Sequence, residues 1–165
     1  MIQKITNAGI EAFSSALTTG GKIEFTRCAI GSGTFNPAVM DPAAMTGLIN
    51  QTASKEISIV RAEENGVAVI ADMDNTIIPG GSKIAEMGLY AAAGGSEMLF
   101  AYAYSPEPET VPESSEATYE RRFITHVALS DDELPLVITY NSITEAIKGT
   151  VRMSVSGSRL VCVTQ

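Results

Sequence analysis

Two adjacent glycines, Gly20 and Gly21, end the first helical stretch of this chain and constrain its start more than any other feature. Before them, Thr6 or Asn7 can cap a helix that runs to about Thr19. Three apolar side chains share one face of this helix, at i, i+3 and i+7: Ile10, Phe13 and Leu17. Glycine readily adopts the left-handed backbone that ends helices. The chain is therefore predicted to begin with an amphipathic helix.

A strand follows the glycine pair and is the first of several. Ile23, Phe25 and Arg27 alternate with polar neighbours, which is the spacing of a β-strand. Three pairs of further β-rich runs suit hairpins: Lys55 to Ala62 with Val67 to Met73, Lys83 to Ala92 with Glu97 to Tyr104, and Thr150 to Val155 with Arg159 to Val163. Two more runs are strand-like: Arg121 to Leu129 and Leu134 to Tyr140. Four side chains of one run point to a single side, which we expect to be the core: Val67, Val69, Ala71 and Met73.

The remaining segments are predicted to connect these elements. Residues 34–54 are irregular, although Ala43 to Asn50 also suits a short helix. Ser105 to Glu120 contains three prolines and five glutamates, so we expect an exposed loop. The sum is a mostly β, α+β fold: an antiparallel sandwich or barrel-like domain with an N-terminal amphipathic helix. We expect one unit, made of a domain over residues 1–140 and a C-terminal β-hairpin extension over residues 141–165.

Composition narrows the class of partner. The 165 residues, 45% of them apolar, suit one domain with a substantial core. Nineteen acidic and eleven basic residues give a net charge of −8, which disfavours nucleic acid and anionic membranes because both need clustered Lys and Arg. No apolar run approaches the ~20 residues of a membrane span, and Met1 to Ile5 lacks the apolar core of a signal peptide. We therefore expect synthesis in a cytoplasm and no membrane insertion.

The reactive side chains have no partners nearby in the sequence. Cys28 and Cys162 lie far apart in apolar runs, where free cysteine packs as a small hydrophobe; a disulfide between them is the alternative. His126, the single histidine, shares a strand face with Ile124 and Ala128 and is expected to be structural or on the surface. The chain has no pattern typical of nucleophilic or zinc hydrolysis. We predict no catalytic residues and no enzyme.

Two motifs resemble ligand sites but lack essential residues. Gly31-Ser32-Gly33 follows a strand, as a dinucleotide-binding loop does, but Asn36 replaces the third glycine and Pro37 blocks the helix that would receive the pyrophosphate. A tight turn is the favoured interpretation. Asp72-Met73-Asp74-Asn75 resembles part of a calcium loop, but Ile77 occupies the place of its glycine, which favours a surface turn. We therefore predict no cofactor-binding and no metal-binding residues.

Two clusters suit more than one interpretation. The five glutamates between residues 107 and 120 fit a solvated loop better than a docking surface for a basic partner. Four aromatic residues fit the alternating core and surface of paired strands better than a carbohydrate platform, because such platforms commonly use tryptophan and this chain has none: Tyr90, Phe100, Tyr102 and Tyr104.

Three ordered segments together resemble a known family. The first runs from Ile5-Thr6-Asn7-Ala8-Gly9-Ile10 through Lys22-Ile23-Glu24-Phe25-Thr26-Arg27 to Ala29-Ile30-Gly31-Ser32-Gly33. The second is Ile84-Ala85-Glu86-Met87-Gly88-Leu89-Tyr90, and the third is Glu97-Met98-Leu99-Phe100-Ala101-Tyr102-Ala103-Tyr104. In order and interval they resemble the phage tail-collar fibre family, whose Glu-Ile-Gly-Leu-Phe strand the second segment matches with Met and Tyr substituted. The resemblance covers roughly residues 1–140.

The resemblance implies the particle-proximal part of a tail fibre, which attaches to the baseplate of a phage, an R-type bacteriocin or a related injection particle. It implies a homotrimer that contacts baseplate or other tail-fibre proteins. Family members often continue into a long shaft and tip, whereas this sequence stops at Gln165. It is therefore expected to be either a short fibre or baseplate component in its own right or an anchoring domain alone, and its shortness favours an adaptor role over direct receptor binding. The alternative is a short receptor-binding protein that recognises a host surface glycan. A polysaccharide depolymerase, which would need paired carboxylates, ranks third.

Overall fold

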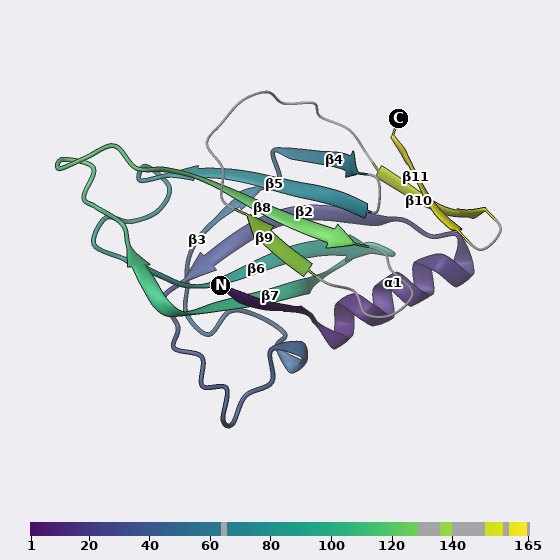
Figure 1. Ribbon diagram of the computed structural model, residues 1–165, viewed down its shortest axis with the longest axis horizontal. Coiled ribbons are helices and arrows are strands. Elements are labelled where there is room, and N and C mark those ends of the chain that lie inside the picture. Colours follow the sequence, from purple (N-terminus) through teal and green to yellow (C-terminus); the bar gives the residue numbers. More distant parts are fainter. Residues whose placement is uncertain (64–65, 129–135, 140–150, 157–158, 165) are drawn as a thin grey trace.

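The computed structural model of the chain describes residues 1–63, 66–128, 136–139, 151–156 and 159–164 (Figure 1). Strands make up 54% of it and lie in two antiparallel sheets beside one short helix, which confirms the predicted mostly β, α+β class. Within the described residues the two sheets stay separate and form no closed barrel. Of the two predicted architectures, the layered one is therefore the one observed.

The larger sheet, sheet A, has the strand order β1-β7-β6-β2-β3. Its strands are β1 (Ile2–Ile5), β7 (Ser96–Thr110), β6 (Lys83–Ala93), β2 (Ile23–Gly31) and β3 (Gln51–Glu56). Sheet B consists of β4 (Ile59–Glu63), β5 (Gly66–Asp74), β8 (Glu120–Ala128) and β9 (Leu136–Thr139), in that order. The other described elements are the hairpin of β10 (Val151–Ser156) and β11 (Arg159–Thr164), helix α1 (Asn7–Thr19) and the 3-10 helix η1 (Pro42–Ala44).

The core lies between the two sheets. Sheet B contributes the four side chains predicted from their alternation, and none of them is more than 2% exposed: Val67, Val69, Ala71 and Met73. Sheet A contributes Met87 and Leu89 from β6, which pack in the same two clusters. Because each sheet is apolar on the face that meets the other, burial of these faces is the main force that joins the layers.

The chain changes sheets between Ile57 and Ser58, where the sequence predicts one continuous run. The amide of Ile57 donates to the carbonyl of Thr26 in sheet A, and the next amide, Ser58, donates to Ile70 in sheet B. The predicted run Lys55 to Ala62 is therefore two strands, and only its second half, β4, pairs with β5. The turn of that hairpin, residues 64–65, lies outside the described residues.

A bulge at Thr26 reverses the expected alternation in β2. The pairing of β2 with β6 shifts between Phe25 and Arg27, so that these two side chains lie on opposite faces of sheet A. Phe25 packs in the core between the sheets, while Arg27 lies over the ring of Tyr90 on the outer face. The prediction that Ile23, Phe25 and Arg27 share one side is wrong for Arg27. A bulge adds one residue to one strand, and simple alternation cannot reveal it.

Helix α1 has the predicted bounds. The side chain of Thr6 caps it by accepting a hydrogen bond from the amide of Gly9 at 3.0 Å, and Gly20 ends it in the left-handed conformation, at φ 68°. Phe13 packs against the core, whereas Ile10 is 45% exposed; the side chain of Leu17 lies outside what the structure describes. The sequence pattern does not predict the short strand β1 before the helix.

The two long connections differ from expectation. In residues 34–54, the only helical turn is η1, and β3 occupies the end of the segment. β7 extends to Thr110 into the predicted exposed loop, and Val111 and Tyr119 are buried in the core. Two buried side chains thus anchor a segment whose other residues are mostly exposed. The predicted C-terminal hairpin of β10 and β11 is observed, and the two strand-like runs before it form β8 and β9, which pair with each other. Residues 140–150 lie outside the described residues.

Candidate functional site

Glu86 is a fully buried carboxylate in the middle of sheet A, and four hydrogen-bond donors surround it. Its Oε1 accepts from the backbone amides of Gly33 and Asn50, at 3.0 and 2.8 Å. Its Oε2 accepts from the amide of Ile49 at 2.9 Å and from the hydroxyl of Tyr102 at 2.9 Å. Because all four partners are donors, they match the acceptor-only chemistry of an ionised carboxylate. A buried polar group is thus satisfied by protein atoms alone.

These bonds fasten both ends of one long connection, which we call the strap (residues 33–50). Gly33 begins the strap and Ile49 and Asn50 end it, so one side chain closes the segment at its base. Figure 1 shows the strap as the dark blue segment that projects below sheet A and carries η1. Glu86 of β6 therefore binds both ends of this loop, beside the backbone bond from the amide of Ser32 to the carbonyl of Asn50 at 3.0 Å.

The glycines before the strap make room for the carboxylate. A Cβ atom on Gly33 would lie 2.4 Å from Oε1 of Glu86, and one on Gly31 would lie 2.5 Å from the same oxygen. Neither glycine has a positive φ angle, so close approach and not backbone freedom explains them. The predicted tight turn at Gly31-Ser32-Gly33 is thus a strand end that packs against a buried acid.

The strap covers a layer of aromatic side chains on the outer face of sheet A. Phe35 of the strap stacks on Tyr104 with ring centroids 4.2 Å apart and lies 5.5 Å from the ring of Tyr102. Burial, together with the hydrogen bond to Glu86, raises the pKa of Tyr102, which keeps its hydroxyl protonated as a donor. Phe100, in contrast, faces the core between the sheets. The aromatic residues are therefore packing residues on both faces. The alternation predicts surface positions for the outer set, but Tyr90 and Tyr102 are buried there in a cluster with Phe35 of the strap.

A second cluster joins β2 to the β6–β7 hairpin on the same outer face. The guanidinium of Arg27 lies 3.6 Å from the ring centroid of Tyr90 and donates to Glu97 from Nε and Nη2, at 3.1 and 3.0 Å. Glu97 also accepts a hydrogen bond from the hydroxyl of Thr26 at 2.6 Å. The bond from Thr26 and then those from Arg27 lower the pKa of Glu97. The stacked ring and the paired carboxylate hold Arg27 in one position.

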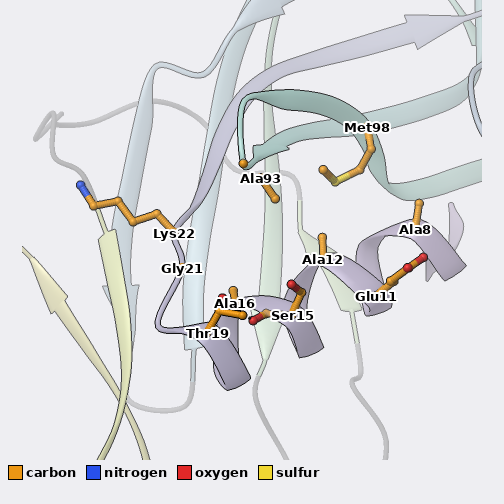
Figure 2. A pocket seen from close by; sticks show the side chains of 11 residues that line it. Ala8, Glu11, Ala12, Ser15, Ala16, Thr19, Gly21, Lys22, Ala93 and Met98 are labelled. Atoms are coloured by element: carbon orange, nitrogen blue, oxygen red, sulfur yellow. Dashed lines mark hydrogen bonds between the residues drawn. The ribbon is translucent and has the colours of Figure 1, made fainter.

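A groove of about 650 Å³ runs between α1 and the end of the β6–β7 hairpin. Small side chains of the helix, Ala12 and Ser15 among them, face Ala93 and Met98 of the hairpin (Figure 2). Glu11 and Lys22 are its charged residues. The walls are thus short, mostly uncharged side chains, which leave space for an inserted segment.

The side chains that the sequence singles out for chemistry have structural partners. His126 lies 2.7 Å from a carboxylate oxygen of Glu63, and Arg122 forms an ion pair with Asp72 on the neighbouring strand. Cys28 is a buried free thiol that packs in the core, as the sequence predicts for a small hydrophobe. Cys162 belongs to β11, and its side chain lies outside the described part of the chain.

The described residues form no obvious centre for metal binding. They contain no group of three His, Cys, Asp or Glu side chains close enough to hold an ion. Asp74 belongs to the segment that resembles part of a calcium loop. Its side chain accepts hydrogen bonds from the amide and the hydroxyl of Thr76, as in a surface turn. Arg121 pairs with Glu109, one of the five glutamates of the 107–120 segment.

No protein-family model matches this chain, and comparisons with curated proteins and with solved structures also find no match. None of the described helices has the length and apolar content needed to cross a membrane.

Sequence reasoning did not identify Glu86 or the groove as functional features. Glu86 could have been identified from its sequence context, because it is a glutamate inside an otherwise apolar strand, Ile84-Ala85-Glu86-Met87. An acid buried in such a strand needs several hydrogen-bond donors around it. The groove has no comparable signal, because its width depends on the distance between a helix and a hairpin.

Proposed function

We propose that this protein is a non-enzymatic structural component of a phage tail or a phage-tail-like contractile particle. It attaches a tail fibre to the baseplate or forms a short tail fibre itself, as a homotrimer that contacts baseplate or other tail-fibre proteins. The proposal starts from the resemblance of three sequence segments to the tail-collar fibre family, and its place of action is the tail or baseplate.

One structural observation supports it: the three resembling segments meet in space. Gly33 of the first and Tyr102 of the third both donate hydrogen bonds to Glu86 of the second. Arg27, Tyr90 and Glu97, again one from each segment, form the second cluster. The three segments form neighbouring strands of sheet A and so make one packing unit, as parts of a single family domain would.

Co-purification with the particle tests this role. A tagged copy, produced together with the tail and baseplate genes that neighbour its own gene, should sediment with assembled particles and be removed when the baseplate genes are omitted. A chain that stays free of every neighbouring tail protein would contradict the proposal. Binding of the isolated protein to whole host cells would instead favour the receptor-binding alternative, and release of reducing ends from host polysaccharide would favour an enzyme.

A further inference from the structure

Gln3 is the one described residue whose buried side-chain polar atoms have no hydrogen-bond partner. Its Oε1 and Nε2 are both covered by other atoms, and neither has a donor or an acceptor within reach among the described residues. The carboxylate of Glu86, in contrast, accepts from four donors. A buried polar group without a partner has lost its hydrogen bonds to water and formed none in their place. Gln3 therefore weakens the strand to which it belongs, β1.

The side chain of Gln3 occupies a core position. In the pairing of β1 with β7, Gln3 lies opposite Ala103 and Ile5 lies opposite Ala101. Ala103 and Ala101 belong to the two main clusters between the sheets, and Ile5 is buried in the second of them. Because alternate residues of a strand share a face, Gln3 points to the same side as Ile5. The edge of β7 thus suits an apolar side chain at the position that the glutamine fills.

β1 is the outermost strand of sheet A and pairs with one neighbour, β7. It is four residues long, and its first residue, Ile2, is 51% exposed. The residue after it is a separate anchor, because the amide of Thr6 donates to the carbonyl of Phe100 at 2.9 Å and its side chain caps α1. Release of β1 therefore leaves α1 in place and exposes the backbone edge of β7. A free strand edge is a template for another strand.

We propose that the edge of β7 is a docking site for an extended strand of another protein, which replaces β1. The incoming strand runs antiparallel to β7 and carries an aliphatic side chain opposite Ala103, where this chain has Gln3. Backbone hydrogen bonds to β7 supply the affinity, and the apolar surroundings of that one position supply the selectivity. β1 closes the sheet until such a partner arrives. The inference rests on β1 and β7 alone and does not depend on a role in a tail particle.

The mismatch at Gln3 makes this exchange feasible. The chain's own strand is tethered beside its site, so a foreign strand competes against an effective concentration on the order of 1 mM. Replacing two unpaired buried polar atoms by apolar ones favours the foreign strand by a factor on the order of 10–100. A matching strand is therefore expected to bind in roughly the 10–100 μM range, and a strand with glutamine at the same position has no such advantage.

Three labelled peptides test the exchange on the full-length chain. One has the sequence of residues 1–6, the second carries Gln3→Met and the third carries Lys4→Met. Methionine is unbranched like glutamine but lacks its amide, and Lys4 is exposed, so the third peptide gains the same apolar group on the wrong face. Fluorescence anisotropy should show the Gln3→Met peptide binding at least tenfold more tightly than the other two. Equal affinity of all three, or no binding of the Gln3→Met peptide at ~1 mM, would overturn the proposal.

The same substitution in the chain tests the competition from the other side. A Gln3→Met chain holds its own strand more firmly, so it should bind the Gln3→Met peptide at least tenfold more weakly than the wild-type chain does. Its β1 amides should also exchange with solvent more slowly. Faster exchange would show that Gln3 makes a favourable hydrogen bond, such as one to an internal water, and would contradict the mismatch. Wild-type chains that dimerise by exchanging β1 in sedimentation would place a second copy in the site and overturn the assignment to another protein.

Discussion

The hydroxyl of Tyr102 donates a hydrogen bond to Glu86 at 2.9 Å, and neither residue has any exposed surface. The two residues lie on neighbouring strands, β6 and β7, and their bond faces the strap side of sheet A. With the three backbone amides that share the carboxylate, it connects the buried centre of sheet A to both ends of the strap. One buried carboxyl group thus contacts the base of the strap at three backbone positions.

Removing the Glu86 carboxylate should free the strap. Glu86→Ala leaves partly buried amides at Gly33, Ile49 and Asn50 without this acceptor, and we expect a loss of roughly 2–4 kcal/mol in unfolding free energy. Glu86→Gln should lose less, since its carbonyl oxygen still accepts, and Tyr102→Phe about 1–2 kcal/mol. Urea denaturation measures these losses.

Hydrogen exchange distinguishes local release from general destabilisation. In Glu86→Gln, the amides of Gly33, Ile49 and Asn50 should exchange faster than in wild type, by more than the amides of β5 do. Glu24→Gln, which replaces an exposed carboxyl on β2, should change neither the unfolding free energy nor the exchange rates of these amides. Equal acceleration at every site would show that Glu86 has no special relation to the strap.

Alanine at Gly33 should be destabilising for a steric reason. The new methyl group would lie 2.4 Å from the Glu86 carboxylate and 2.5 Å from the Cβ of Ile49, so the strap must shift. We expect a loss of about 1–3 kcal/mol in unfolding free energy. Gly47→Ala is the matched control within the strap, because its methyl group would meet only the Tyr90 hydroxyl at 4.0 Å. Similar losses for both substitutions would contradict the steric explanation.

Local signals in the sequence predict local elements well. A capping threonine and a left-handed glycine predict α1, and alternation with glycine turns predicts the β6–β7 and β10–β11 hairpins. The change of sheet at Ile57 and Ser58 is not predictable in this way, because both halves of the run are equally β-rich and only the pairing partners differ. The bulge at Thr26 escapes prediction because it depends on the partner strand.

The candidate site is less accessible to sequence reasoning for a similar reason. Glu86 and Gly33 can each be recognised in the sequence as unusual residues. They are 53 positions apart, however, and the sequence does not show that they are in contact. Glu86 fits beside Gly33 because the glycine has no side chain, and this contact exists only in the tertiary structure. Patterns identify the segments that matter, and only the fold identifies the contact.

The Arg27–Glu97 pair should stabilise the fold in a pH-dependent way. The pKa of Glu97 is lowered from 4.5 in the folded state, so its contribution is complete above that value and disappears as the pH falls through the folded pKa. The difference in unfolding free energy between wild type and Glu97→Gln should therefore shrink on acidification below about pH 4.5. Glu116→Gln, an exposed control, should show no such trend. A difference that grows in acid would contradict the assigned direction.

Replacing Arg27 by lysine tests whether geometry matters beyond charge. Lysine keeps the charge near Glu97 but loses the two-nitrogen contact and the flat stack on Tyr90. We expect Arg27→Lys to lower the unfolding free energy, and Tyr90→Leu to remove most of the difference between arginine and lysine in a double-mutant cycle. Equal stability of Arg27→Lys and wild type would show that the charge alone suffices.

Cys28 should be inert in the folded protein. Its thiol is 3% exposed, and burial raises its pKa to about 12, so very little thiolate exists at pH 8. In a Cys162→Ser background, where Cys28 is the remaining cysteine, a thiol reagent should react at least roughly 100-fold more slowly in buffer than in denaturing urea. A Cys28→Ser, Cys162→Ser double variant supplies the blank. Rapid labelling without denaturant would show that β2 opens readily to solvent, in conflict with its central place in sheet A between β6 and β3.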